Sequence, residues 1–295
     1  MINEILLLLS EVVLSAYPLL IKLVDASVIF QTGLRMATFT ALAAVAALST
    51  GTSVNYATML SSETLAVGLL NLIHVWTSYT AFDQLTGGNA MALFYTYPVW
   101  NILGASAILG ESFSKASLPW IGLALLGAIA LSQPTTDNWT LVGVVCALLA
   151  AITEAGIYLW FKVGAGKDEG KEKKEDEPWT KMIQMYGGSG VLWVLGIVAA
   201  SLLGFLAKNT FNLSGPGLGG ILAFNSLVGF VGYALRFYIV PRVSTIVFSA
   251  LSFFGIISAY IFDWVFTKQK PNTMQIAGAI AIIVANAVLV TRETA

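Results

Sequence analysis

The chain has 295 residues, of which 57% are hydrophobic and only 11% are charged, and its mean hydropathy is +0.80. Soluble domains carry about 25% charged residues, so this composition excludes a soluble protein and predicts an all-α integral membrane protein. The net charge of −1 offers no strongly basic surface, which argues against nucleic acid as a partner.

The counts of cysteine and histidine exclude several kinds of active site. Cys146 is the single cysteine, His74 is the single histidine, and no G-x-x-x-x-G-K-[ST] motif occurs. An intrachain disulfide, a multi-thiol or histidine-rich metal site and P-loop ATP hydrolysis are therefore excluded. Little remains from which to build an enzyme, and we expect no catalytic residue, no cofactor and no metal.

From the N-terminus onward, ten apolar segments follow one another, and most hold about 20 residues, enough to cross a hydrocarbon core of about 30 Å. Backbone groups cannot stay unpaired in lipid, so these segments are predicted to be helices. The ten predicted spans are Ile5–Val24, Val28–Leu48, Leu65–Phe82, Ala90–Leu109, Leu118–Ser132, Trp139–Phe161, Met182–Leu206, Leu218–Val240, Val243–Phe266 and Met274–Val290.

The positions of lysine and arginine predict the orientation. If the N-terminus is cytoplasmic, nine of these residues fall on the cytoplasmic side and four on the opposite side. This excess agrees with the positive-inside rule. Both termini are therefore predicted to be cytoplasmic, in a multi-pass protein of the plasma or inner membrane.

A charged stretch at residues 164–180 divides the spans into two units of five, residues 1–133 and residues 134–295. Its composition predicts a solvated cytoplasmic linker. Ile121-Gly122 and Ala277-Gly278 match at an offset of 156 residues. Because five is odd, the two units would enter the membrane from opposite sides, and inverted repeats of this kind place a substrate site between them near the midplane.

Acidic residues within two spans point to a function, because a charge at a helix centre costs about 2.5–3.5 kcal/mol on the insertion scale. In the first span one face carries the polar residues and the proline, namely Glu4, Glu11, Ser15, Pro18 and Lys22. In the sixth span, Tyr158 and Lys162 follow Glu154 at helical spacing. Glu11 and Glu154 lie at similar predicted depth and could bind a proton or a cation; alternatively, Glu154 pairs with Lys162.

Polar side chains on four further spans complete the candidate substrate site. They are Asn71, His74 and Ser78 on the third span, Tyr97 and Asn101 on the fourth, Asn225 and Tyr233 on the eighth, and Ser249 and Ser252 on the ninth. His74 falls near mid-membrane, where it either changes charge near neutral pH or serves as a hydrogen-bonded structural residue. The hydroxyl groups could equally join neighbouring helices.

Two arginines lie inside the spans. Arg35 is expected either to bind an anionic group or to neutralise an acid such as Asp25. Together with Glu11, Glu154 and His74, it is a candidate for charge or proton coupling. Arg236 is expected near the cytoplasmic end of the eighth span, where its side chain can extend to the interface.

The stretch Ala90–Gln133 carries a family resemblance. Tyr97-Pro98, then Leu109-Gly110-Glu111, then Trp120-Ile121-Gly122 opening an alanine- and glycine-rich span, resemble the EamA-like branch of the drug/metabolite transporter superfamily. Weaker patterning of the same kind recurs near the C-terminus. The resemblance implies ten helices in two inverted repeats, with helices one, three, four, six, eight and nine around the site. The second copy departs from the pattern, because Thr267 stands near where Glu111 would be repeated.

Together these features predict a secondary transporter that moves a small polar or zwitterionic metabolite, an amino acid being the leading candidate, by alternating access. Its partners would be this small-molecule substrate and the lipid bilayer, with proton coupling and the choice between monomer and homodimer left open. An exchanger of nucleotide sugars or sugar phosphates is the alternative within the superfamily. It comes second because Arg35 and Arg236 are expected near opposite faces. A non-transporting receptor or channel is the alternative outside it.

Overall fold

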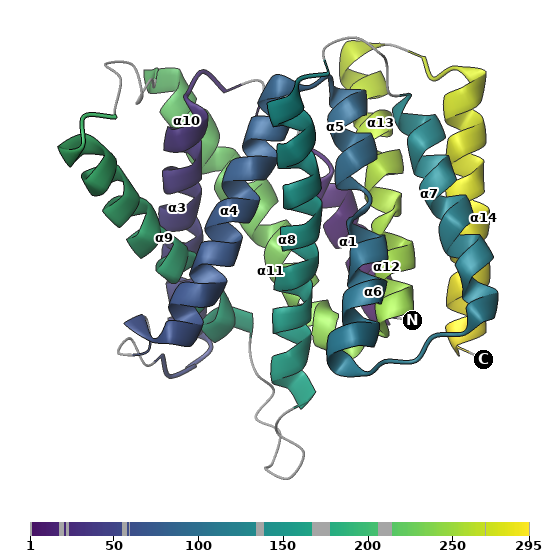
Figure 1. Ribbon diagram of the computed structural model, residues 1–295, viewed down its shortest axis with the longest axis horizontal. Helices are drawn as coiled ribbons and strands as arrows, with labels where there is room; N and C mark the ends of the chain where they lie inside the picture. The colour runs from purple at the N-terminus through teal and green to yellow at the C-terminus, as the bar shows by residue number, and fades with distance from the viewer. Residues whose placement is uncertain are drawn as a thin grey trace.

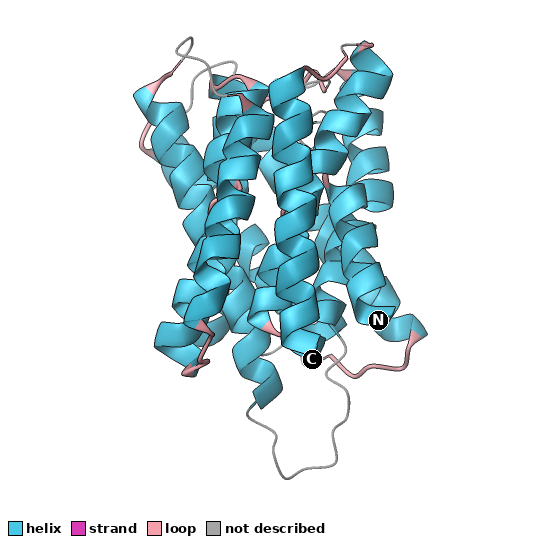
Figure 2. Ribbon diagram, turned by 90° about the vertical axis from the view of Figure 1, so that its right-hand side faces the viewer, coloured by secondary structure: helices cyan, strands magenta, loops and turns pink. Residues whose placement is uncertain are grey.

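The computed structural model describes residues 2–17, 21, 24–54, 58, 60–133, 139–166, 178–205, 214–268 and 270–294, and this part of the chain contains helices and no β-strand. The helices stand side by side in one bundle (Figures 1 and 2), with the two termini at the end of the bundle at which α8 ends. The helices are α1 (Ile2–Leu14), α3 (Val28–Ser49), α4 (Ser62–Gln84), α5 (Gly87–Phe94), α6 (Tyr97–Leu109), η2 (Lys115–Ser117), α7 (Leu118–Ser132), α8 (Leu141–Gly166), α9 (Pro178–Leu202), α10 (Gly215–Phe224), η3 (Asn225–Phe230), α11 (Val231–Ile239), η4 (Val240–Arg242), α12 (Thr245–Ser252), α13 (Phe254–Thr267) and α14 (Thr273–Thr294).

The chain is a multi-pass integral membrane protein. Within the described residues, nine helical stretches are long and apolar enough to cross a bilayer. Large apolar side chains such as Leu141 and Leu202 lie exposed on the outside of the bundle, where lipid would cover them. The predicted count of ten also needs the first span, Ile5–Val24, of which α1, Tyr17 and Ile21 are described while Pro18 and Lys22 lie outside the described residues.

Among the later spans that the structure describes, three are not continuous α-helices. The fourth breaks between α5 and α6, directly before Pro98, whose ring and missing N–H disrupt the hydrogen-bond ladder as the sequence predicted. The ninth breaks at Phe253, between α12 and α13. The eighth contains the π-helical turn η3 between α10 and α11. Gly255 allows the two breaks to meet, since a Cβ there would collide with the hydroxyl of Tyr95.

The helices of the two halves pack against each other rather than within separate bundles. α4 packs on α8 and α9, α1 packs on α11, α3 packs on α9, and α7 packs on α14. The contact between α4 and α9 is close, because a Cβ added at Gly188 would lie 2.6 Å from the carbonyl oxygen of Thr64. Ser189 reinforces it by donating a hydrogen bond to the carbonyl oxygen of Gly68 at 2.8 Å. The glycines of this region therefore serve close packing.

Candidate functional site

A buried arginine joins both halves of the molecule at the centre of the bundle. Arg236, on α11, donates from Nη1 to Glu154 Oε1 at 2.7 Å and from Nη2 to the Tyr97 hydroxyl at 2.5 Å. Its Nη2 also lies 3.2 Å from Glu11 Oε1. All four side chains are buried. Two carboxylates from different halves thus share one guanidinium.

The side chain of Arg236 does not extend outward to the interface as expected, but pairs inside the bundle. Helical side chains point back toward the N-terminus of their own helix. The N-terminus of α11 faces the middle of the bundle, so the guanidinium extends inward and is 4% exposed.

His74 extends the charged cluster. Its Nε2 lies 3.2 Å from Glu154 Oε2, and its Nδ1 lies 3.1 Å from the carbonyl oxygen of Ala150. A carbonyl oxygen accepts only, so we assign the Nδ1 proton to this hydrogen bond. The nearby Thr153 hydroxyl already donates to the carbonyl oxygen of Leu149 at 2.6 Å. The Nε2 atom therefore faces the carboxylate of Glu154.

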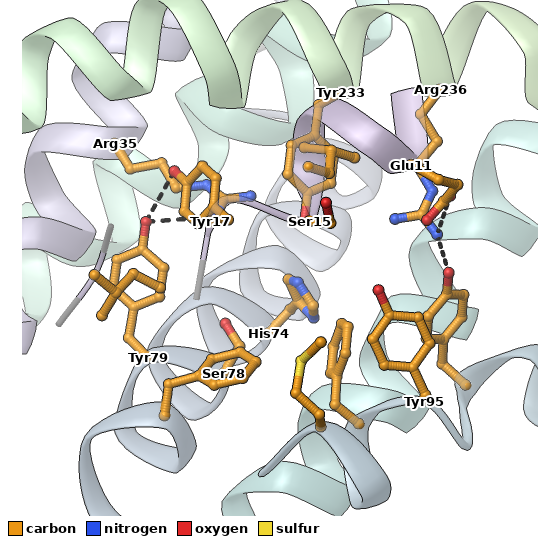
Figure 3. A pocket seen from close by; sticks show the side chains of 16 residues that line it. Glu11, Ser15, Tyr17, Arg35, His74, Ser78, Tyr79, Tyr95, Tyr233 and Arg236 are labelled. Carbon is orange, nitrogen blue, oxygen red and sulfur yellow. Dashed lines mark hydrogen bonds and ion pairs between the residues drawn. The ribbon is translucent and has the colours of Figure 1, made fainter. Parts of the chain in front are cut away.

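Beside this cluster lies a cavity of about 50 Å³. Figure 3 shows Arg35 at one side of it, Glu11 and Arg236 at the other, and Ser15, His74 and Tyr233 between them. The cavity is lined by Glu11, Leu14, Ser15, Tyr17, Ile21, Arg35, His74, Ser78, Tyr79, Phe82, Met91, Phe94, Tyr95, Tyr97, Tyr233 and Arg236. The expectation that Arg35 and Arg236 lie near opposite faces is therefore wrong, since both border one cavity.

A second, smaller cavity of about 10 Å³ lies beyond Arg236 and Tyr97, which border both spaces. Asn101, Glu154 and Tyr158 are among its lining residues. Arg236 and Tyr97 thus form the partition between the two cavities.

Arg35, on α3, is surrounded by aromatic rings. Its Cζ lies 4.7 Å from the ring centroid of Tyr233, 4.9 Å from that of Tyr17 and 5.0 Å from that of Phe39. Tyr79 and Tyr186 are slightly farther away, at 5.8 and 6.0 Å. We call these five rings the aromatic box. The expected neutralisation by Asp25 is not seen, because Asp25 is exposed whereas Arg35 is 2% exposed.

One chain of hydrogen bonds holds the aromatic box in place. Arg35 Nη1 donates to the Tyr79 hydroxyl at 3.5 Å, Tyr79 donates to the Tyr17 hydroxyl at 3.0 Å, and Tyr17 donates to Asn225 Oδ1 at 2.7 Å. Asn225 therefore holds Tyr17 in position by a hydrogen bond and is not itself among the lining residues of the cavity.

A polar cluster joins the halves again nearer the end of the bundle that carries the termini. Lys162 Nζ lies 2.9 Å from Glu111 Oε1 and donates to Thr245 Oγ1 at 2.7 Å. Tyr158 donates to the same Thr245 oxygen at 3.0 Å. We call Glu111, Tyr158, Lys162 and Thr245 the latch. Between the latch and Arg236, the rings of Phe161 and Phe237 are stacked at 4.0 Å.

The alternative pairing of Glu154 with Lys162 is not what the structure shows. Eight residues along a helix span about 12 Å, too far for this pair to meet on one face. Glu154 instead contacts Arg236 and His74, while Lys162 contacts Glu111.

The structure brings most of the predicted site residues around these two spaces. The larger cavity is bordered by Glu11, Ser15, His74, Ser78, Tyr97 and Tyr233, and the smaller by Asn101, Glu154 and Tyr158. Outside both linings are Asn71, Asn225, Ser249 and Ser252. Asn71 joins α4 to α9, since it donates a hydrogen bond to Ser189 Oγ at 2.8 Å. Ser252 contacts the charged cluster, since it donates to Glu11 Oε1 at 3.4 Å.

Sequence reasoning missed Tyr17, Tyr79 and Tyr95, which line the larger cavity. Tyrosine is common in membrane helices, so no pattern singled out these three. For Arg236 a signal existed, because a cation inside an apolar span needs a partner.

Comparisons with known proteins establish the fold. No family model matches the chain, and no curated protein matches it. A solved structure described only as "Crystal structure of protein" superposes with a TM-score of 0.73 over 99% of this chain and 99% of its own, at 15% sequence identity. This similarity shows a shared fold.

Proposed function

We propose that the protein is a secondary transporter of the drug/metabolite superfamily, which moves a small polar or zwitterionic metabolite across the membrane by alternating access. The observation that carries the proposal is the buried cluster of Glu11, Tyr97, Glu154 and Arg236, contributed by both halves and placed beside a cavity inside a membrane bundle. Ionisable groups buried within membrane spans typically mark the path of a substrate or an ion.

Two inverted five-helix repeats account for the packing. If each span of the first unit is matched to the span at the same place in the second, α4 corresponds to α11 and α8 to α1, and both pairs of helices are in contact. In the same way, the contact of α5 with α7 corresponds to the contact of α12 with α14. Contacts of α3 with α9 and of α7 with α14 map onto themselves.

The helix ends repeat as well. Ser61 and Ser214 cap the N-termini of the third and eighth spans, and Thr86 and Ser244 cap those of the fourth and ninth. The fourth and ninth spans both end in a left-handed residue, Gly110 and Lys268. Matched caps at matched places support a duplicated unit.

The arrangement fits a transporter closed toward the end that carries the termini. The latch and the stacked rings of Phe161 and Phe237 lie on that side of Arg236, and the Lys162–Glu111 ion pair joins the two halves. Opening toward this end requires the pair to separate. On the predicted orientation, this is the cytoplasmic side.

Charge counting supports proton coupling. Ionised Glu11 and Glu154 carry two negative charges against the single positive charge of Arg236. With Nδ1–H of His74 committed to Ala150, Nε2 and Glu154 Oε2 would be two acceptors facing each other at 3.2 Å unless one of them carries a proton. One bound proton removes this conflict and makes the cluster neutral, so proton release or uptake would change its charge during the cycle.

Transport by purified protein in liposomes tests the proposal. We expect uptake of radiolabelled polar metabolites above that of protein-free liposomes, increased by an imposed proton gradient. Glu11→Gln and Glu154→Gln should each lower this uptake, whereas Glu63→Gln, a change at an exposed position in the first turn of α4, should not. Normal uptake by both site variants at every pH would show that transport does not need the two carboxylates.

An exchanger of sugar phosphates or nucleotide sugars is the second candidate, because Arg35 and Arg236 border the same cavity. It is less favourable because Arg236 is already neutralised by carboxylates. Uptake of labelled nucleotide sugars in the same liposomes distinguishes the two, and absence of any uptake would favour a receptor.

A further inference from the structure

The second buried arginine has donors that no described residue uses. Arg35 Nη1 reaches the Tyr79 hydroxyl, but Nε and Nη2 make no hydrogen bond of normal geometry with a described residue, although the hydroxyls of Tyr186 and Tyr233 lie near the guanidinium. Both atoms are buried, and the side chain borders the larger cavity. Described ion pairs of the site involve Arg236, His74 and Lys162, and none involves Arg35. A buried cation of this kind is costly unless something supplies the missing acceptors during the working cycle.

The two unused donors stand on the same edge of the guanidinium. In arginine, the N–H of Nε and one N–H of Nη2 point in parallel, which matches the two oxygens of a carboxylate. The remaining edge is directed to Tyr79, and the rings of the aromatic box surround the cation at 4.7–6.0 Å. Figure 3 shows the guanidinium extending from α3 toward the middle of the cavity.

A further donor lies close to this edge. The hydroxyl of Tyr186 belongs to the aromatic box and is buried beside the Arg35 guanidinium, and it makes no hydrogen bond of normal geometry with a described residue. A phenol can donate to the same anion that the guanidinium binds. Three donors that make no hydrogen bond of normal geometry with a described residue thus gather at one side of the cavity.

We propose that Arg35 is the subsite for the carboxylate of the substrate, bound edge-on by Nε and Nη2 with help from Tyr186. This rests on the proposed transport function and narrows its substrate to a compound with one planar, singly charged anionic group. Among the described residues that line the cavity, only Arg35, His74 and Arg236 are basic, and Arg236 is already paired. One free guanidinium balances a carboxylate but leaves a doubly charged phosphate half-neutralised.

The geometry also gives the direction in which the substrate binds. Glu11, the carboxylate among the described lining residues, is on the side opposite Arg35, next to Arg236. A zwitterion would therefore place its carboxylate at Arg35 and its amine toward Glu11. The aromatic residues between the two sides, such as Phe94 and Tyr233, would contact the uncharged part.

Binding is measured first, as the shift of the thermal unfolding midpoint of the full-length protein in detergent, with each of the common L-amino acids as a probe. For each amino acid that stabilises the protein, its C-terminal amide, its amine-free acid and inorganic phosphate are compared. We expect the amide, which lacks the carboxylate, to bind at least about 30-fold more weakly than the amino acid, a loss that corresponds to about 2 kcal/mol.

Two variants separate a binding role from a structural one. Arg35→Gln should give a folded, monodisperse protein whose response to the amino acid is lost, and Arg35→Lys should recover part of it because the charge returns without the parallel donors. Tyr186→Phe should weaken binding severalfold and leave the aromatic packing intact. Equal binding of amino acid and amide, a response retained in Arg35→Gln, stronger binding of phosphate, or no response to any amino acid would each overturn the carboxylate subsite.

Liposome uptake then distinguishes this failure from failure of the proposed function. Uptake of amines or neutral polar solutes without uptake of carboxylates would reject the subsite while leaving transport intact. Uptake of no solute above protein-free liposomes would reject both.

Discussion

Two arginines border the same cavity, yet their surroundings differ in kind. Arg236 is held by two carboxylates and a phenol at 2.5–3.2 Å, whereas Arg35 is held by five aromatic rings and one long hydrogen bond. Both are almost fully buried, at 4% and 2% exposure. The role of a charged residue inside a membrane protein is therefore indicated by the groups that it contacts and not by its burial alone.

The comparison assigns different work to the two residues. Arg236 links Glu11 of the first half to Glu154 of the second and forms part of the partition between the cavities. Its donors are used within the protein. The aromatic box stabilises the charge of Arg35 through the ring faces, each cation–π contact contributing about 0.5–2 kcal/mol, and leaves one hydrogen-bonding edge unoccupied. One arginine organises the protein, and the other is available to a ligand.

The largest effect should come from Arg236→Met. It leaves Glu11 and Glu154 buried without a cation, which costs about 3–5 kcal/mol when one partner of a buried pair is removed. We expect a strongly lowered thermal midpoint or loss of folded protein. Adding Glu154→Gln to this variant should restore part of the stability, and Arg292→Met, at an exposed site, should change it little. A stable Arg236→Met protein would show that the cluster does not organise the bundle.

The close contact of α4 with α9 places Tyr186 in the aromatic box, and Gly188→Ala tests it. The added Cβ would lie 2.6 Å from the Thr64 carbonyl oxygen, so the helices must separate. Overpacking of this kind typically costs about 1–3 kcal/mol. Gly190→Ala is the matched control, because its nearest neighbour would be Met36 Cβ at an ordinary 3.7 Å. Equal thermal midpoints for the two variants would contradict the tight packing.

The helical membrane-spanning segments were predictable from the apolar composition of the chain, whereas the pairing of the charged residues was not. The spans follow from apolar length, and the break before Pro98 follows from the missing N–H. The break at Phe253 has no proline and gave no such signal. For the site, spacing identified Glu11, His74 and Glu154 as residues of interest, but it could not select their partners.

The missed partners are distant in sequence. Arg236 and Glu154 are 82 residues apart, and Arg35 and Tyr79 are 44 apart, so only the packing of helices brings them together. Local reasoning offered Lys162, on the same helix, as an alternative partner of Glu154, whereas Lys162 pairs with Glu111 across the interface between the halves. The side chain of Arg236 points inward because helical side chains are directed toward the N-terminus of their helix, and a hydropathy pattern carries no information about this direction.

The latch should matter more for conformation than for stability. Lys162 and Glu111 are 14% and 36% exposed at their side chains, and pairs near the surface contribute only about 0–1 kcal/mol. Lys162→Met should therefore unfold at nearly the same temperature. It should open the smaller cavity more often, which a cysteine at Val240 on a Cys146→Ser background would report by faster thiol labelling. Unchanged labelling would mean that the latch does not control access from this side.

A similarly small effect on stability should come from Arg35→Met, measured without ligand. Loss of the cation–π contacts and relief of an unpaired buried charge act in opposite directions, so we expect a net change within about 1 kcal/mol. The same substitution type at Arg236 is expected to cost several times more, which makes the pair of variants a direct test of the contrast between the two residues. Thermal unfolding of both, under identical detergent conditions, measures it. Equal losses would mean that Arg35 is as much a part of the framework as Arg236, and its unused edge would then no longer distinguish it as a ligand site.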